Sequence, residues 1–319
     1  MGTFHHHHIP SIAPEIRGAV YVEHERLMRF AAYASVSMAS ALIILKTIAW
    51  WMSDSLAMLS SLTDSFFDVL TSVMNLIALR YALKPADDDH RFGHNRIEDI
   101  VGLAQCACIV ASMLIIMLQS FERLSNPEPM THSALGIGVS MIAMVATGAL
   151  VIFQGYVAKR TKSLIIAADR LHYVGDVLFN LGVIIALVLT SVSGWLWADP
   201  AMAILMALAI IYSSKDLGLR AYNNLMDTEM PDDEKAKIYD VLSSMPEVLG
   251  HHHLKTRYAG NKPFIQMHID LSASLSFMAA HEIVDRLERA LELVFPNAEV
   301  IIHPDPRIHR PNHPDRYDA

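Results

Sequence analysis

The stretch that decides the fold is Ser61–Tyr81, SLTDSFFDVLTSVMNLIALRY, an apolar run that carries two aspartates. Asp64 and Asp68 are four residues apart, so a helix presents both carboxylates on one face. A carboxylate in hydrocarbon is costly, and it therefore faces protein, water or an ion. The stretch predicts a membrane-spanning helix with a functional face.

A second pair with the same spacing lies in the apolar segment LHYVGDVLFN, where His172 and Asp176 stand one helical turn apart. A single intramembrane aspartate can serve as a hydrogen-bond partner inside a helix bundle. Two matched pairs in separate spans are better explained as a cage of four ligands. The cage consists of Asp64, Asp68, His172 and Asp176. Three carboxylates and one imidazole suit a tetrahedrally held divalent cation such as zinc or ferrous iron.

The composition is that of a membrane protein. Of the 319 residues, 53% are hydrophobic and 18% are charged, which is more apolar than an ordinary soluble domain. The net charge is −8, so the composition does not indicate a protein that binds nucleic acid. Cys106 and Cys108 share one apolar run, which argues against a disulfide framework. The polar N-terminal stretch lacks the apolar segment of a cleavable signal peptide.

Apolar runs long enough to cross a bilayer recur through the first two-thirds of the chain. We expect six transmembrane helices, at roughly Leu27–Met52, Leu56–Leu83, Ile100–Phe121, Ser133–Val157, Ser163–Val192 and Trp197–Leu217. Basic residues gather at one set of their ends, so the positive-inside rule places both termini in the cytoplasm. The expectation is a multi-pass protein of the cell inner membrane.

The expected organisation has four parts. Residues 1–25 form an N-terminal tail, to whose His5–His8 we assign no role, and residues 26–222 form the transmembrane domain. Residues 223–306 form a cytoplasmic metal-binding domain, and residues 307–319 form a disordered tail. Within the cytoplasmic domain, the patterns predict helix, strand, strand, helix and strand at Pro231–Met245, His252–Arg257, Phe264–Leu271, Ser276–Val294 and Ala298–His303. This αββαβ order favours an α+β domain with helices on one face of a sheet.

Two further groups of polar residues could bind metal. The loop between the second and third spans holds Asp87, His90 and His94, which are potential zinc ligands; the alternative is a solvated acidic loop. The cytoplasmic domain contains a larger set: His252, His268, His281, His303 and Asp305. Scattered surface histidines are the alternative here. Phosphate-loop, nucleophile-elbow and HExxH patterns are absent from the sequence, so no enzyme signature is found.

Several stretches together resemble the cation diffusion facilitators, over roughly residues 27–306. They are LTDSFFD, LRYALKPADDDHRFGH, ADRLHYVGD, WADP, FIQMHIDL and EVIIHPDP. The resemblance implies a homodimer, zinc/proton antiport and a ferredoxin-like cytoplasmic domain. It also implies that the cage is the transport site, that the loop residues bind metal, and that Asp305 bridges two ions in the cytoplasmic set.

Two positions depart from the family pattern. Asn95 and Arg96 stand where similar pumps have Gly-Lys, and that lysine pairs at the dimer contact with an acid that corresponds to Asp227. His253 stands where similar pumps have an acid, which leaves open whether it joins the cytoplasmic site.

The functional hypothesis is a secondary transporter that exports a divalent cation, such as zinc, iron(II) or cadmium, in exchange for protons. A membrane-anchored metal sensor and a metal-selective channel are the alternatives. Buried acids in the spans argue against the sensor, because a mere anchor does not need them.

Overall fold

The computed structural model describes residues 14–53, 56–125, 134–193, 195 and 197–307. His5–His8 and most of the two expected tails lie outside these residues. The chain separates into a helical unit, Glu25–Met226, and a second unit that contains the residues from Asp227 onward.

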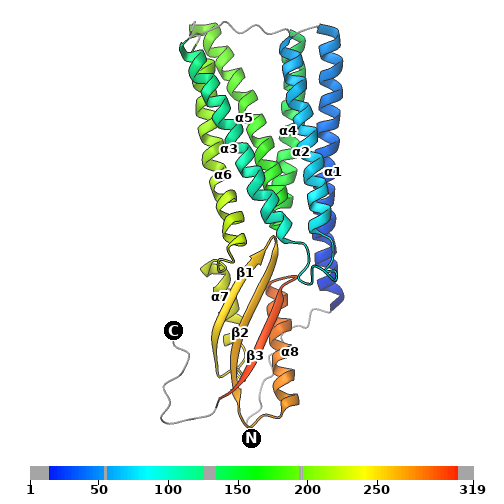
Figure 1. Ribbon diagram of the computed structural model, residues 1–319, viewed down its shortest axis with the longest axis vertical. Coiled ribbons are helices and arrows are strands. Elements are labelled where there is room, and N and C mark those ends of the chain that lie inside the picture. Colours follow the sequence, from blue (N-terminus) through cyan, green and yellow to red (C-terminus); the bar gives the residue numbers. More distant parts are fainter. Residues whose placement is uncertain (1–13, 54–55, 126–133, 194, 196, 308–319) are drawn as a thin grey trace. The chain divides into compact units, whose positions relative to one another are not determined.

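Within the described residues, six long helices build the helical unit and run side by side (Figure 1). They are α1 Pro14–Ser53, α2 Leu56–Ala82, α3 Arg96–Ser125, α4 Ala134–Thr161, α5 Leu164–Ser193 and α6 Ala198–Leu225. Among the described residues, α1, α2, α3, α4 and α6 each contain an apolar segment long enough to cross a membrane. The 30-residue helix α5 carries the polar residues Asp169, His172 and Asp176 in its first half and packs against α4 and α6. The predicted architecture of membrane-spanning helices is confirmed.

Helix α5 belongs to two of the apolar clusters of the helical unit. Its residues Ile165 and Ile166 pack with buried residues of α1, α2 and α4, among them Met28 and Leu79. Farther along, α5 packs against a core that α3 and α6 build around Met113, Ala207 and Ile210. The helix that bears half of the expected cage is therefore held between neighbours on both sides.

The second unit has the predicted αββαβ order. Its described elements are α7 Asp232–Ser243, β1 Gly250–Ala259, β2 Lys262–Ser272, α8 Phe277–Val294 and β3 Glu299–Arg307. The strands form one sheet in the order β1-β2-β3, with β1 antiparallel and β3 parallel to β2 (Figure 1). A hydroxyl cap begins α8, where Ser276 Oγ accepts the backbone N–H of Ala279 at 3.2 Å.

Strand alternation gives the sheet one apolar face and one polar face. The alternate β2 residues Met267 and Ile269 are fully buried and pack in one core with Ile283 and Leu287 of α8. His268, which lies between them, is therefore on the opposite face. The same face carries His252 of β1 and His303 of β3, the residues that pair with His268 in the sheet.

Candidate metal centres

Among the described residues, three groups have ligand atoms that all lie within 4.8 Å of one another. The first lies between membrane helices and consists of Asp68 on α2 with His172 and Asp176 on α5. His172 Nε2 is 3.0 Å from Asp68 Oδ1 and 3.9 Å from Asp176 Oδ2. One-turn spacing puts both α5 residues on the same face, and the packing of α2 on α5 brings Asp68 to them.

Asp64 is the one predicted cage residue outside this group. It lies one turn before Asp68 on α2 and is exposed. Its neighbour Ser65 is buried and receives a hydrogen bond of 2.7 Å from Lys46 Nζ of α1. Our sequence reasoning missed Lys46, although a lysine in an apolar span is a recognised functional signal.

A second buried carboxylate, Asp169, lies three residues before His172 on α5. Its Oδ2 accepts hydrogen bonds from Ser35 Oγ and Gln154 Nε2, both at 2.6 Å. Its Oδ1 accepts a hydrogen bond from Asn75 Nδ2 at 2.9 Å. These bonds tie the ligand-bearing part of α5 to α1, α4 and α2. Sequence reasoning missed this residue too, and the signal was the same: an acid inside a predicted span.

Tyr173 adds a further bond between the two helices of the cage. Its hydroxyl is 2.8 Å from Ser72 Oγ of α2, and both side chains are buried. Because Tyr173 is adjacent to His172, this bond and those of Asp169 fix α5 on both sides of that histidine.

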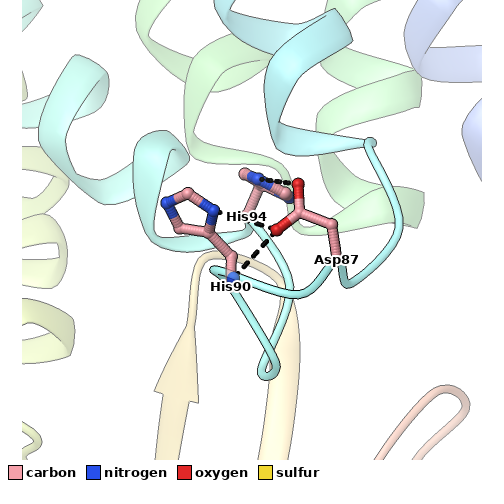
Figure 2. Close-up of side chains that lie close together, drawn as sticks. All are labelled: Asp87, His90 and His94. Carbon is pink, nitrogen blue, oxygen red and sulfur yellow. Dashed lines mark hydrogen bonds and ion pairs between the residues drawn. The ribbon is translucent and has the colours of Figure 1, made fainter.

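The second group is the loop between α2 and α3 (Figure 2). Asp87 Oδ1 accepts the backbone N–H of His90 at 2.8 Å and lies 3.1 Å from His90 Nδ1. Asp87 Oδ2 lies 3.4 Å from His94 Nε2. The loop can turn back on itself because Gly93 adopts a φ of +85°. The three predicted loop residues are thus brought together.

The chemistry of the loop group fits a cation. His94 Nδ1 lies 3.2 Å from the carbonyl oxygen of Lys84 and donates to it, which leaves Nε2 with a free lone pair. This Nε2 is buried and has no hydrogen-bond partner. The Lys84 ammonium, 2.5 Å from Asp87 Oδ2, holds the pKa of Asp87 well below its usual range. Asp87 is therefore an ionised ligand throughout the physiological pH range.

The third group lies on the polar face of the sheet. In the strand register, His252 of β1 is opposite His268 of β2, which in turn is opposite His303 of β3. Asp305 Oδ2 lies 2.8 Å from His268 Nδ1 and 3.4 Å from His252 Nε2. Asp305 Oδ1 lies 3.4 Å from His303 Nε2. The carboxylate of Asp305 thus lies close to three histidines, two at Oδ2 and one at Oδ1.

His281, the fifth predicted residue of this set, is not part of the group. It lies on α8, which packs on the other face of the sheet, and its Nε2 is 3.7 Å from Asp285 Oδ1. His253 lies closer: its ring centroid is 5.4 Å from that of His268. It has a φ of +50° and falls at an irregularity in the β1–β2 register.

Asp270 also borders the third group, and sequence reasoning missed it. Its Oδ1 lies 3.8 Å from His252 Nδ1. A Cβ at Gly250, the residue opposite, would lie only 2.6 Å from Asp270 Oδ2. Glycine at that position therefore leaves room for the carboxylate. The available signal was its place two residues after His268, on the same strand face.

The two residues of the expected dimer contact have other partners in this chain. Asp227 Oδ1 accepts a hydrogen bond of 3.0 Å from Arg257 Nη1. Arg96 Nη1 donates to the backbone carbonyl of Asn224.

Membrane-spanning helices around an acid-and-histidine centre, together with an α+β unit that bears its own ligand cluster, define a membrane transporter for metal cations. Comparison with known proteins agrees with this class. Residues 32–226 match the cation efflux transmembrane domain, and residues 230–307 match the cation efflux protein cytoplasmic domain (ZT_dimer). The chain belongs to the cation efflux family.

Its relatives include the cation-efflux pump FieF of Salmonella agona and that of Salmonella newport. Each is 42% identical to this chain over 281 residues, which cover 88% of this chain and 93% of the relative. The chain is therefore a multi-pass membrane transporter for divalent cations and not an enzyme.

Proposed function

We propose that the chain exports zinc from the cytoplasm in exchange for protons, with iron(II) and cadmium as further substrates. The observation that carries this proposal is the group of Asp68, His172 and Asp176 between membrane helices. Two oxygen ligands and an imidazole suit zinc and iron(II). Asp64, one turn away on α2, supplies the fourth ligand when its side chain turns toward the group.

The metal-free geometry supports the proposed exchange for protons. His172 Nε2 and Asp68 Oδ1 are 3.0 Å apart, and two lone-pair atoms approach this closely only when a hydrogen lies between them. A metal ion needs both lone pairs and displaces that hydrogen, which is released as a proton when the imidazole carries hydrogens on both of its nitrogens. A proton that arrives from the other side of the membrane then helps to expel the metal.

The other two groups are proposed as regulatory metal sites. The loop group consists of Asp87, His90 and His94. The sheet group consists of His252, His268, His303 and Asp305, with His281 joining only after a rearrangement or from elsewhere in the assembly. The match to a cytoplasmic domain of the ZT_dimer type supports a homodimer.

The proposed orientation places both termini in the cytoplasm and the protein in the inner membrane. Arg80 in the last turn of α2, and Lys159 and Arg160 in the last turn of α4, lie at the ends expected to face the cytoplasm. Residues 26–222 and 223–306 are then the transport domain and the cytoplasmic metal-binding domain.

The deciding experiment is metal uptake into inverted membrane vesicles under an imposed pH gradient, across zinc, iron(II), cadmium and manganese. We expect saturable zinc uptake that an acidic lumen accelerates and that stops when the gradient is dissipated, against control vesicles that lack the protein. Uptake that ignores the gradient would favour a channel. Metal binding without any uptake would favour a sensor.

A further inference from the structure

Helix α1 carries a lysine within its membrane-spanning segment, Val22–Met52. Lys46 lies about 10 Å from the end of α1 at Ser53, given the rise of 1.5 Å per residue. Asp64 lies about 12 Å along α2 from its first residue, Leu56. The lysine and the first aspartate of the cage are therefore at the same depth, on neighbouring helices.

The hydrogen bonds of Lys46 hold its ammonium beside the cage but do not neutralise it. Its Nζ donates to Ser65 Oγ at 2.7 Å and to the carbonyl oxygen of Ser61 at 3.2 Å. Both acceptors are uncharged, and they lie on α2 on either side of Asp64. A charged ammonium in a membrane helix is costly unless an opposite charge is near. The carboxylates of Asp64 and Asp176 are near enough to act on Lys46 electrostatically.

We propose that Lys46 is the built-in counter-cation of the transport site. The proposal rests on the proposed function, because it takes the cage as the place where the metal binds. The cage has three carboxylates, whose charge one divalent cation and one lysine ammonium neutralise together. A loaded site that includes Lys46 is electrically neutral, whereas the same site without it carries a net negative charge inside the membrane.

The ammonium also affects the release of the metal ion from the transport site. It repels the metal ion and therefore weakens metal binding, and conduction through a site requires binding weak enough for the ion to leave. The hydrogen bonds of Lys46 are to Ser65 Oγ and the Ser61 carbonyl rather than to a carboxylate, so the ammonium acts on the site through its charge. Lys46 is a positioning and affinity-setting residue, not a ligand.

The test is zinc uptake by proteoliposomes that contain Lys46→Gln or Lys46→Arg. Glutamine keeps a hydrogen bond to Ser65 and loses the charge. We expect its half-saturating zinc concentration to fall about tenfold, together with the maximal rate, because bound zinc is released more slowly. Lys46→Arg keeps the charge, and we expect its half-saturating zinc concentration and its maximal rate to lie within about threefold of those of the parent. Lys237→Gln, at an exposed position on α7, is the control for loss of one positive charge.

Two results would overturn the proposal: an unchanged half-saturating concentration in Lys46→Gln, or the same defect in the arginine and glutamine variants. If Lys46→Gln does not insert, the double variant Lys46→Gln/Asp64→Asn decides, because it removes both charges together. Recovery of insertion in the double variant supports the pairing of the charges. Failure of both shows a structural role and contradicts the proposal. Full uptake by Asp68→Ala would instead refute the proposed transport site, whatever Lys46 does.

Discussion

The intramembrane group and the sheet group use the same kinds of ligand but are built in opposite ways. In the membrane, two helices contribute the ligands, and His172 and Asp176 of α5 are adjacent through one turn of the same helix. On the sheet, His252, His268 and Asp305 come from three strands, and no two of them are close in sequence. The first group depends on the packing of two helices, and the second depends on strand register.

This difference decides how tightly each group is held. Around His172, the buried bonds of Asp169 and Tyr173 fix α5 to its neighbours. The sheet group lies on an uncovered face of the sheet, and the side chain of its His303 is 64% exposed. The side chains of the membrane group are therefore held more rigidly than those of the sheet group.

The largest expected effect separates the two groups by transport. Asp68→Ala removes a ligand and the hydrogen-bond partner of His172, and we expect zinc uptake to fall about 100-fold or more. His268→Ala should leave uptake at saturating zinc within about twofold of the parent, since its side chain lies in the other unit. Uptake assays on equal amounts of the two purified variants make the comparison. Equal losses in both would show that the groups do not have separate roles.

A smaller effect concerns stability in the presence of metal. Metal that binds only the folded form stabilises it by about 2.7 kcal/mol at one hundred times the dissociation constant. We expect His268→Ala to lose most of the zinc-induced rise in the melting temperature of the second unit. His281→Ala, outside the observed group, is the matched control and should keep this rise. If His281→Ala instead loses the zinc-induced rise and His268→Ala keeps it, His281 is a ligand and the group rearranges when metal binds.

The smallest effect concerns an ion pair that belongs to neither metal group, and it serves as a reference for the stability measurements. Glu247 has its pKa lowered by its own backbone N–H and then by Arg286, whose Nη2 lies 2.8 Å from Glu247 Oε1. A lowered pKa means that this stabilisation is complete above the unfolded value of about 4.3 and disappears as the pH falls through the folded value. Both side chains are well exposed, so we expect Arg286→Gln to cost about 0–1 kcal/mol.

Melting curves of the full chain at pH 7 and pH 3 test this expectation. The difference between the parent and Arg286→Gln should be present at pH 7 and absent at pH 3. A difference that persists at pH 3 would show that Arg286 stabilises through packing of its side chain rather than through charge.

The features that could be predicted from the sequence are those that depend on the periodicity of a single helix or strand. Helical spacing was sufficient to place His172 and Asp176 on one face, and strand alternation was sufficient to place His268 away from the core. The helix and strand order of both units also followed from these periods. Helix ends were less accurate: α6 continues to Leu225, beyond the expected Leu217.

What the sequence could not predict depends on contacts between distant elements. Asp64 has the correct spacing from Asp68, but its side chain is exposed and lies outside the group. His281 shares a residue type with the sheet group, but α8 crosses the opposite face. Asp270 shares a strand face with His268, but its approach to His252 depends on the pairing of β1 with β2. Spacing within one element says nothing about which elements will be neighbours.

The bonds of Asp169 also constrain how the protein is made. Ser35 and Asp169 are 134 residues apart, so α1, α2 and α4 are synthesised before the carboxylate that their polar side chains require. Ser35 and Gln154 also bond to each other at 2.7 Å, and Ser35 Oγ donates to the carbonyl of Ala31 as well. Asn75 has Asp169 as its hydrogen-bond partner, and hydrocarbon offers its amide no replacement. The polar interior of the first four helices is therefore completed only when α5 joins them.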